Sequence, residues 1–74
     1  MDHKLDAKRL LCPMPVIKAQ NAIKSLTAGD RLTVTCTDPG AKSDIPAWCR
    51  VHGHQLESVI EDGNEIKITI LVCK

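Results

Sequence analysis

Apolar and polar side chains alternate strictly in residues 31–37, and in residues 65–73 an apolar residue stands at every second position from Ile66 to Val72. A period of two is typical of a β-strand with one buried face. The apolar positions are Leu32, Val34, Cys36, Ile66, Ile68, Ile70 and Val72. The opposite, exposed face would carry Thr33, Thr35, Lys67 and Thr69. A sheet of this kind needs a cover for its apolar face, and that requirement constrains the fold more than any other feature.

Two segments with helical periodicity can supply this cover. From about Pro13 to Leu26, apolar residues recur at steps of three and four, namely Val16, Ala19, Ile23 and Leu26. We expect a second helix with Asp44 as its N-cap, Pro46 in its first turn and Gly53 at its end. The shared face of this second helix would carry Ile45, Trp48, Cys49 and His52.

Two further strands complete the pattern. They are predicted at Leu5–Ala7 and at residues 55–61, and Asp62-Gly63 is a hairpin signal before the last strand. The order β-α-β-α-β-β predicts an α/β (α+β) fold, a two-layer sandwich with a four-stranded mixed sheet and two helices on one face. Because 74 residues leave room for one small core, we expect residues 1–74 to form a single domain.

Composition argues against two classes of function. Lys and Arg number 10 against 9 Asp and Glu, and Trp48 is the single aromatic residue. Nucleic-acid binders usually show a basic stripe or stacking aromatics, so we expect no direct nucleic-acid binding. The N-terminus does not resemble a signal peptide and no segment could span a bilayer. We therefore expect a cytoplasmic protein without membrane association, and the near-neutral charge fits a monomer.

The sequence Cys12-Pro13-Met14-Pro15 stands where the first helix should begin. Because a residue before proline avoids helical geometry, we expect Cys12 at the N-cap and Pro13 at the first helical position. Lys8 and Arg9 lie just upstream. The helix dipole and these bases would lower the pKa of the thiol and favour a nucleophilic thiolate. Serine or aspartate would serve better as a purely structural cap, so the placement indicates chemistry.

The other cysteines and the histidines have simpler interpretations. Cys36 and Cys49 fall on predicted buried faces, whereas Cys73 ends the last strand with nothing activating around it. There is no Cys-x-x-Cys pair, which disfavours a zinc ribbon and a thioredoxin-like site. A thiol-disulfide protein using Cys12 with Cys49 or Cys73 remains an alternative. The spacing of Cys49, His52 and His54 matches no common metal site, so we expect no metal.

Together these segments resemble the TusA-type sulfur carriers of the wider SirA-like group, over nearly the whole chain. The shared residues are Leu5-Asp6-Ala7, Cys12-Pro13-x-Pro15, Lys18, Gly29, Asp38-Pro39, Asp44-Ile45-Pro46-x-Trp48-Cys49 and Gly53-His54-x-Leu56. Two positions depart from the family pattern. Arg9 stands where the family usually has glycine, and Met14 stands where an acidic residue is common.

The resemblance implies the same two-layer sandwich and a Cys12 that carries sulfur as a persulfide. It implies a sulfurtransferase-like carrier rather than a stand-alone enzyme, with no cofactor. The donor would be a cysteine desulfurase or a rhodanese-type protein, and the acceptor a protein of the DsrE type. The sulfur would serve tRNA thiolation, molybdenum-cofactor synthesis or sulfur oxidation. Pro13 and Pro15 would shape the turn, with Lys8, Arg9 and Lys18 available for docking or thiolate stabilisation. The alternative is a regulatory or RNA-binding module of the same fold.

Overall fold

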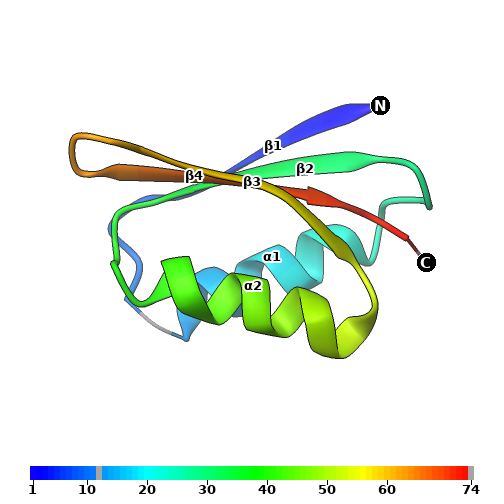
Figure 1. Ribbon diagram of the computed structural model, residues 1–74, viewed down its shortest axis with the longest axis horizontal. Helices are drawn as coiled ribbons and strands as arrows, with labels where there is room; N and C mark the ends of the chain where they lie inside the picture. Colours follow the sequence, from blue (N-terminus) through cyan, green and yellow to red (C-terminus); the bar gives the residue numbers. More distant parts are fainter. Residues whose placement is uncertain (12, 74) are drawn as a thin grey trace.

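The computed structural model describes residues 1–11 and 13–73, which form four strands and two helices (Figure 1). In chain order the elements are β1 (Asp2–Ala7), α1 (Met14–Ile23), β2 (Arg31–Cys36), α2 (Ala41–His52), β3 (Gln55–Asp62) and β4 (Glu65–Leu71). The predicted order of elements is confirmed.

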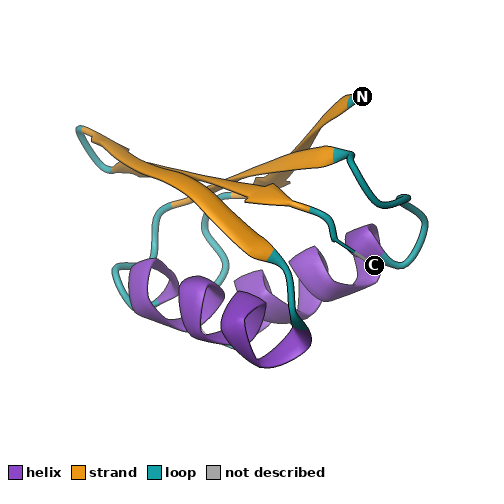
Figure 2. Ribbon diagram, turned by 45° about the vertical axis from the view of Figure 1, so that its right-hand side comes forward, coloured by secondary structure: helices purple, strands orange, loops and turns teal. Residues whose placement is uncertain are grey.

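The four strands form one mixed sheet with the order β1-β2-β4-β3. β1 and β2 are parallel and are connected through α1, whereas β4 is antiparallel to both of its neighbours. Both helices lie on the same face of the sheet (Figure 2). α1 packs against β1 and β2, and α2 packs against β3 and β4. The predicted two-layer α+β sandwich is confirmed.

The two alternating segments bury the faces that their periodicity predicts. The predicted apolar positions are all buried between the sheet and the helices, as Leu32, Val34, Cys36, Ile66, Ile68, Ile70 and Val72. On the opposite face Thr33 pairs with Thr69, and their hydroxyl oxygens are 3.2 Å apart. This cross-strand hydrogen bond is typical of a strand pair with one solvent-facing side.

The ends of α1 differ from the prediction. Pro13 is the N-cap residue and Met14 the first helical residue, so the helix begins one residue later than expected. It ends at Ile23 rather than Leu26, because the amides of Ser25 and Leu26 turn to the carbonyls three residues before them. Such tighter bonding is common where a helix finishes.

The start of α2 also differs, and the prediction of Asp44 as its cap is wrong. Gly40 is the N-cap, because the Asp38 side chain accepts a hydrogen bond from the Gly40 amide at 3.2 Å and turns the chain before Ala41. Asp44 therefore lies in the first turn and Pro46 inside the helix. Gly53 ends the helix in the left-handed conformation, with φ of 79°, as predicted.

The strand ends differ by a few residues. β1 begins at Asp2, earlier than the predicted start at Leu5. Asp62 pairs with Glu65, so the hairpin turn is Gly63-Asn64 rather than Asp62-Gly63. These end shifts leave the predicted buried faces of β2 and β4 unchanged, and in β3 the pairing with β4 shifts register between Leu56 and Ser58.

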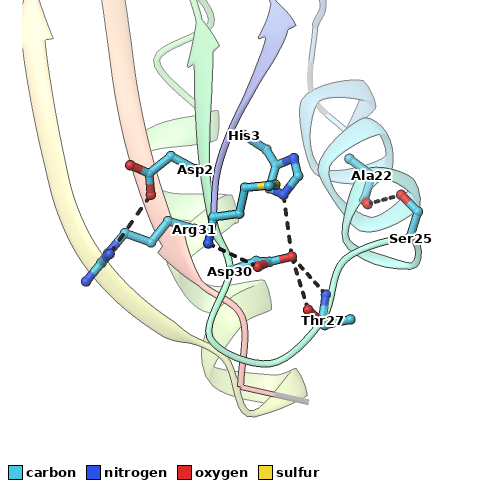
Figure 3. Close-up of polar contacts among 8 residues, drawn as sticks. Asp2, His3, Ala22, Ser25, Thr27, Asp30 and Arg31 are labelled. Atoms are coloured by element: carbon cyan, nitrogen blue, oxygen red, sulfur yellow. Dashed lines mark hydrogen bonds and ion pairs between the residues drawn. The ribbon is translucent and has the colours of Figure 1, made fainter.

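Asp30 ties the connection between α1 and β2 to the start of β1 (Figure 3). Its carboxylate accepts hydrogen bonds from the Thr27 amide at 3.1 Å and from the Thr27 hydroxyl at 3.3 Å. It also lies 3.4 Å from Nε2 of His3 and 3.3 Å from the amino group of Met1. The hydrogen bond from the Thr27 amide is the main reason that the pKa of Asp30 is lowered. This cluster lies at the opposite end of β1 from Lys8 and Arg9.

Candidate functional site

The predicted nucleophile, Cys12, lies outside the described residues, whereas the residues on both sides of it are described. The segment that contains Cys12 begins where β1 ends, at Ala7, and continues into α1. The geometry of the site is therefore built from this segment and from the elements that hold it.

The chain leaves β1 through a tight turn at Lys8 and Arg9. The Lys8 amide donates to Oδ1 of Asp6 at 2.9 Å, which is an Asx-type turn. Arg9 has φ of 66°, in the left-handed region that a side chain with a Cβ rarely adopts. Its amide donates to the Thr37 hydroxyl at 2.9 Å, so the residue that follows β2 holds the turn that follows β1.

α1 starts with a proline on each side of Met14. Pro13 has φ of −94° and ψ of 12° and makes no side-chain cap hydrogen bond. The Met14 amide donates to the Leu11 carbonyl at 2.8 Å, and the Ile17 amide donates to the Pro13 carbonyl at 3.1 Å. The Pro15 side chain is buried, whereas Pro13 is exposed. Pro15 therefore anchors the first turn to the core, while Leu11, Pro13 and Met14 lie at the surface.

Lys18 connects the helix to the strand. Its ammonium group donates to the Asp6 carbonyl at 2.7 Å, which places its charge beside the end of β1. Lys8 lies 4.0 Å from the Glu65 carboxylate, and both side chains are about half exposed, so this pair contributes little to stability. Lys8 and Arg9 therefore belong to one turn, and Lys18 reaches the same strand end from the helix.

A polar groove of about 420 Å³ opens beside this turn. Its lining comes from the ends of β1 and β2 and from the β3–β4 hairpin, as Asp6, Lys8, Arg9, Thr37, Asn64 and Glu65. Thr37 and Asn64 were not singled out from the sequence. Their positions just after strands are a weak signal, because most residues at strand ends have no function.

The other described cysteines divide as the sequence predicts. Cys36 is buried and its thiol donates to the Ile66 carbonyl at 3.6 Å, and burial raises its pKa. Cys49 is 1% exposed, and burial raises its pKa to about 11. Both are core residues, as expected. Cys73 is exposed, and its amide donates to Nδ1 of His54 at 3.2 Å. A buried, protonated Cys49 is a poor resolving thiol, which weakens the thiol-disulfide alternative.

The histidines next to α2 pack against the single tryptophan. The ring centroids of His52 and His54 lie 4.6 Å and 5.4 Å from that of Trp48, and both pairs are stacked. Over residues 1–11 and 13–73, no three His, Cys, Asp or Glu side chains are grouped to hold a metal ion. In the same residues, no helix combines the length and the apolar character needed to cross a membrane.

Comparison with known proteins assigns the family. Residues 3–72 match the family described as sulfurtransferase TusA. Bacillus subtilis YrkI is 42% identical over 69 residues, which are 93% of this chain and 92% of YrkI. The sulfur carrier protein TusA of Allochromatium vinosum is 33% identical over 69 residues, or 93% of this chain and 91% of that protein.

A solved structure supports the same assignment at the level of the fold. The crystal structure of a SirA-like protein from Desulfitobacterium hafniense superposes with a TM-score of 0.84 at 28% identity. The alignment covers 97% of this chain and 99% of that one. The chain belongs to the TusA family of sulfur carriers.

Proposed function

We propose that this protein carries sulfane sulfur as a persulfide on Cys12. The observation that carries the proposal is the Cys12-Pro13-x-Pro15 sequence at the start of α1, in a chain that belongs to a sulfur carrier family. The positive end of the helix dipole favours an anion there, although Pro13 and Pro15 supply no N–H group. Lys8, Arg9 and Lys18 add positive charge around the same strand end. These groups favour the thiolate form that attacks sulfur.

The transfer is an exchange at sulfur. The Cys12 thiolate attacks the terminal sulfur of a donor persulfide, R–S–SH, and forms a new S–S bond while the donor S–S bond breaks. The products are the Cys12 persulfide, which keeps the proton, and the donor thiolate, R–S⁻. Delivery of the sulfur uses the same exchange with the roles reversed. An acceptor thiolate attacks the terminal sulfur of the Cys12 persulfide, and Cys12 leaves as its thiolate. This step consumes no oxidant, reductant or metal.

The proposed partners are those that the resemblance to the family implies. The donor is a cysteine desulfurase or a rhodanese-type protein, and the acceptor is a thiol protein of the DsrE type. The acceptor passes the sulfur to tRNA thiolation or to sulfur oxidation and trafficking. Residues 1–74 act as one carrier domain, monomeric and cytoplasmic, that releases each partner after the exchange.

Mass spectrometry of the intact protein after incubation with inorganic polysulfide tests the proposal. Cys73→Ser, which removes the exposed Cys73 thiol, should gain one sulfur atom. The double variant Cys12→Ser/Cys73→Ser should gain none. Dithiothreitol should remove the added sulfur, because it reduces a persulfide to the thiol. If the double variant gains the same mass as Cys73→Ser, the assignment of the carrier residue is wrong.

A further inference from the structure

A hollow of about 340 Å³ opens between the two helices, at the end of the molecule where both of them finish. The end of α1 and the turn after it contribute Ile23, Lys24 and Leu26, and the end of α2 and the residues after it contribute Trp48, His52 and His54. Figure 1 places this end of the helix layer opposite the end at which α1 starts. We call this cavity the helix-end hollow.

Three rings form one wall of the hollow. His52 and His54 stack against Trp48 with angles of 28° and 21° between the ring planes. The Cys73 amide donates to Nδ1 of His54 at 3.2 Å, which holds that ring in place. Ile23 is buried and adds an apolar surface to the lining. A flat ring that enters the hollow can continue the stack, because offset-stacked rings attract each other.

The charge of the lining has one sign. Lys24 is positive, His52 and His54 become positive when protonated, and none of the described residues that line the hollow is acidic. Both helix dipoles point their negative ends to this region, but backbone amides already bond to the terminal carbonyls. The Lys24 amide donates to the Gln20 carbonyl at 3.3 Å, and the His54 amide to the Cys49 carbonyl at 2.9 Å. The lining therefore favours an anion over a cation.

The indole of Trp48 also has a donor without an acceptor. Over residues 1–11 and 13–73, its Nε1 atom is buried and has no hydrogen-bond partner. Buried polar groups are normally paired, and an unpaired one costs stability. After a small rotation of the indole, an acceptor group on a ligand in the hollow would give this N–H its partner.

We propose that the helix-end hollow binds a small molecule that combines a flat aromatic ring with a carboxylate. The ring stacks on the rings of Trp48, His52 and His54, and the carboxylate pairs with Lys24. Apolar walls with a few convergent polar groups are typical of small-molecule sites, whose volumes start at about 300 Å³, so the hollow suits a ligand of one or two fused rings. The proposal does not depend on the carrier function proposed above.

NMR of the ¹⁵N-labelled full chain tests the proposal, because Trp48 is the single tryptophan and gives the single indole N–H signal. The probe is 2-naphthoate. Two matched compounds separate its features: 2-naphthylmethanol keeps the flat rings without the charge, and cyclohexanecarboxylate keeps the charge without a flat ring. Lys24→Gln removes the cation of the hollow. Lys42→Gln is the control, because Lys42 is an exposed lysine that pairs with Glu61 elsewhere. The spectrum of each variant also shows whether it is folded.

We expect 2-naphthoate to shift the indole signal at neutral pH with a Kd of about 1 mM or below. Each of the two matched compounds should bind about fivefold more weakly, because one loses the charge pairing and the other the stacking. Lys24→Gln should raise the Kd of 2-naphthoate about threefold, the size expected for an exposed charge pair. Lys42→Gln should leave this Kd within about 1.5-fold of wild type.

Contrary results overturn the proposal at different points. If 2-naphthoate leaves the indole signal unchanged, or shifts mainly the backbone signals of Leu11, Met14 and Ile17, the hollow is not a site for this class of ligand. If 2-naphthylmethanol binds as tightly as 2-naphthoate, the assignment of an anionic ligand is wrong. Equal binding of cyclohexanecarboxylate would refute the stacking argument. If Lys24→Gln and Lys42→Gln change the Kd equally, Lys24 does not hold the carboxylate.

Discussion

Replacing Arg9 by glycine should stabilise this protein, although Arg9 lies in the segment that leads to Cys12. The reason is the left-handed backbone at Arg9, with φ of 66°. A residue with a Cβ loses about 1–2 kcal/mol in that region, and glycine loses none. Glycine also makes the unfolded chain more flexible, which costs about 0.4–1 kcal/mol. The difference predicts that Arg9→Gly raises the free energy of unfolding by about 0.5–1 kcal/mol.

The hydrogen bond that holds this turn survives the substitution. The Arg9 amide donates to the Thr37 hydroxyl, and glycine keeps the same amide. For a chain of this size, a gain of about 0.5–1 kcal/mol corresponds to a rise of about 2–8 °C in Tm. Glycine at this position is also what the resemblance to the family predicts.

The neighbouring residue supplies the matched control. Lys8 does not have a positive φ, so Lys8→Gly gains nothing in the folded state and should lower the free energy of unfolding by about 0.5–1 kcal/mol. Urea unfolding at neutral pH, followed by circular dichroism and by Trp48 fluorescence, measures both variants. Opposite signs for the two variants are the expected result. If Arg9→Gly is as destabilising as Lys8→Gly, the argument from backbone strain is refuted.

Three further substitutions or modifications test other parts of the structure. Thr37→Val removes the hydroxyl that accepts the Arg9 amide, and it should lower the free energy of unfolding by about 1 kcal/mol in the same urea assay. The control Thr35→Val, on the open face of the sheet, should change this free energy by less than about 0.5 kcal/mol. In the folded protein at about pH 8, iodoacetamide should modify the exposed Cys73 but not Cys49, because burial raises the pKa of Cys49 to about 11. Peptide mass spectrometry identifies the modified residues, and equal labelling of the two would contradict the burial of Cys49. Asp30→Asn should be less stable than wild type at neutral pH. Because the pKa of Asp30 is lowered in the native state, its carboxylate stabilises the fold above the unfolded-state pKa, and this stabilisation is lost as the pH falls through the native pKa. The urea midpoints of the two proteins should therefore converge in acid. A difference between the midpoints that does not depend on pH would contradict this linkage.

The fold was predictable because its main determinants are periodic. The period of two at Leu32–Cys36 and Ile66–Val72 identifies two central strands, and their apolar faces are buried as predicted. A one-residue error in a strand would turn every side chain to the wrong face, so this kind of pattern fixes register strongly. Helix ends are different, because they depend on one or two hydrogen bonds. The Asp38 side chain accepts a hydrogen bond from the Gly40 amide, and α2 therefore starts before the predicted cap at Asp44.

The chemistry of the site stays a prediction from the sequence, whereas the contacts that support the segment around it could not be predicted. A cysteine followed by two spaced prolines indicates a helix start and a reactive thiol from local rules alone. The contact of Lys18 with the Asp6 carbonyl spans 12 residues, and that of Arg9 with Thr37 spans 28. No local pattern reports such contacts. No prediction covers Leu11 and Ile17, and both side chains are exposed.

The parallel pairing of β1 and β2 explains why the turn at Arg9 has its particular conformation. The register places Ala7 beside Cys36, the last residues of the two strands, so the segments that follow them leave the sheet side by side. Thr37, the first residue after β2, then accepts a hydrogen bond from the Arg9 amide, and the chain after β1 turns back through the left-handed Arg9. The approach to Cys12 is therefore set by the end of a strand 28 residues further along the chain. A bare Cys-Pro-x-Pro sequence without such a strand pair would lack this support, so the ordered set of segments carries more information than the motif alone.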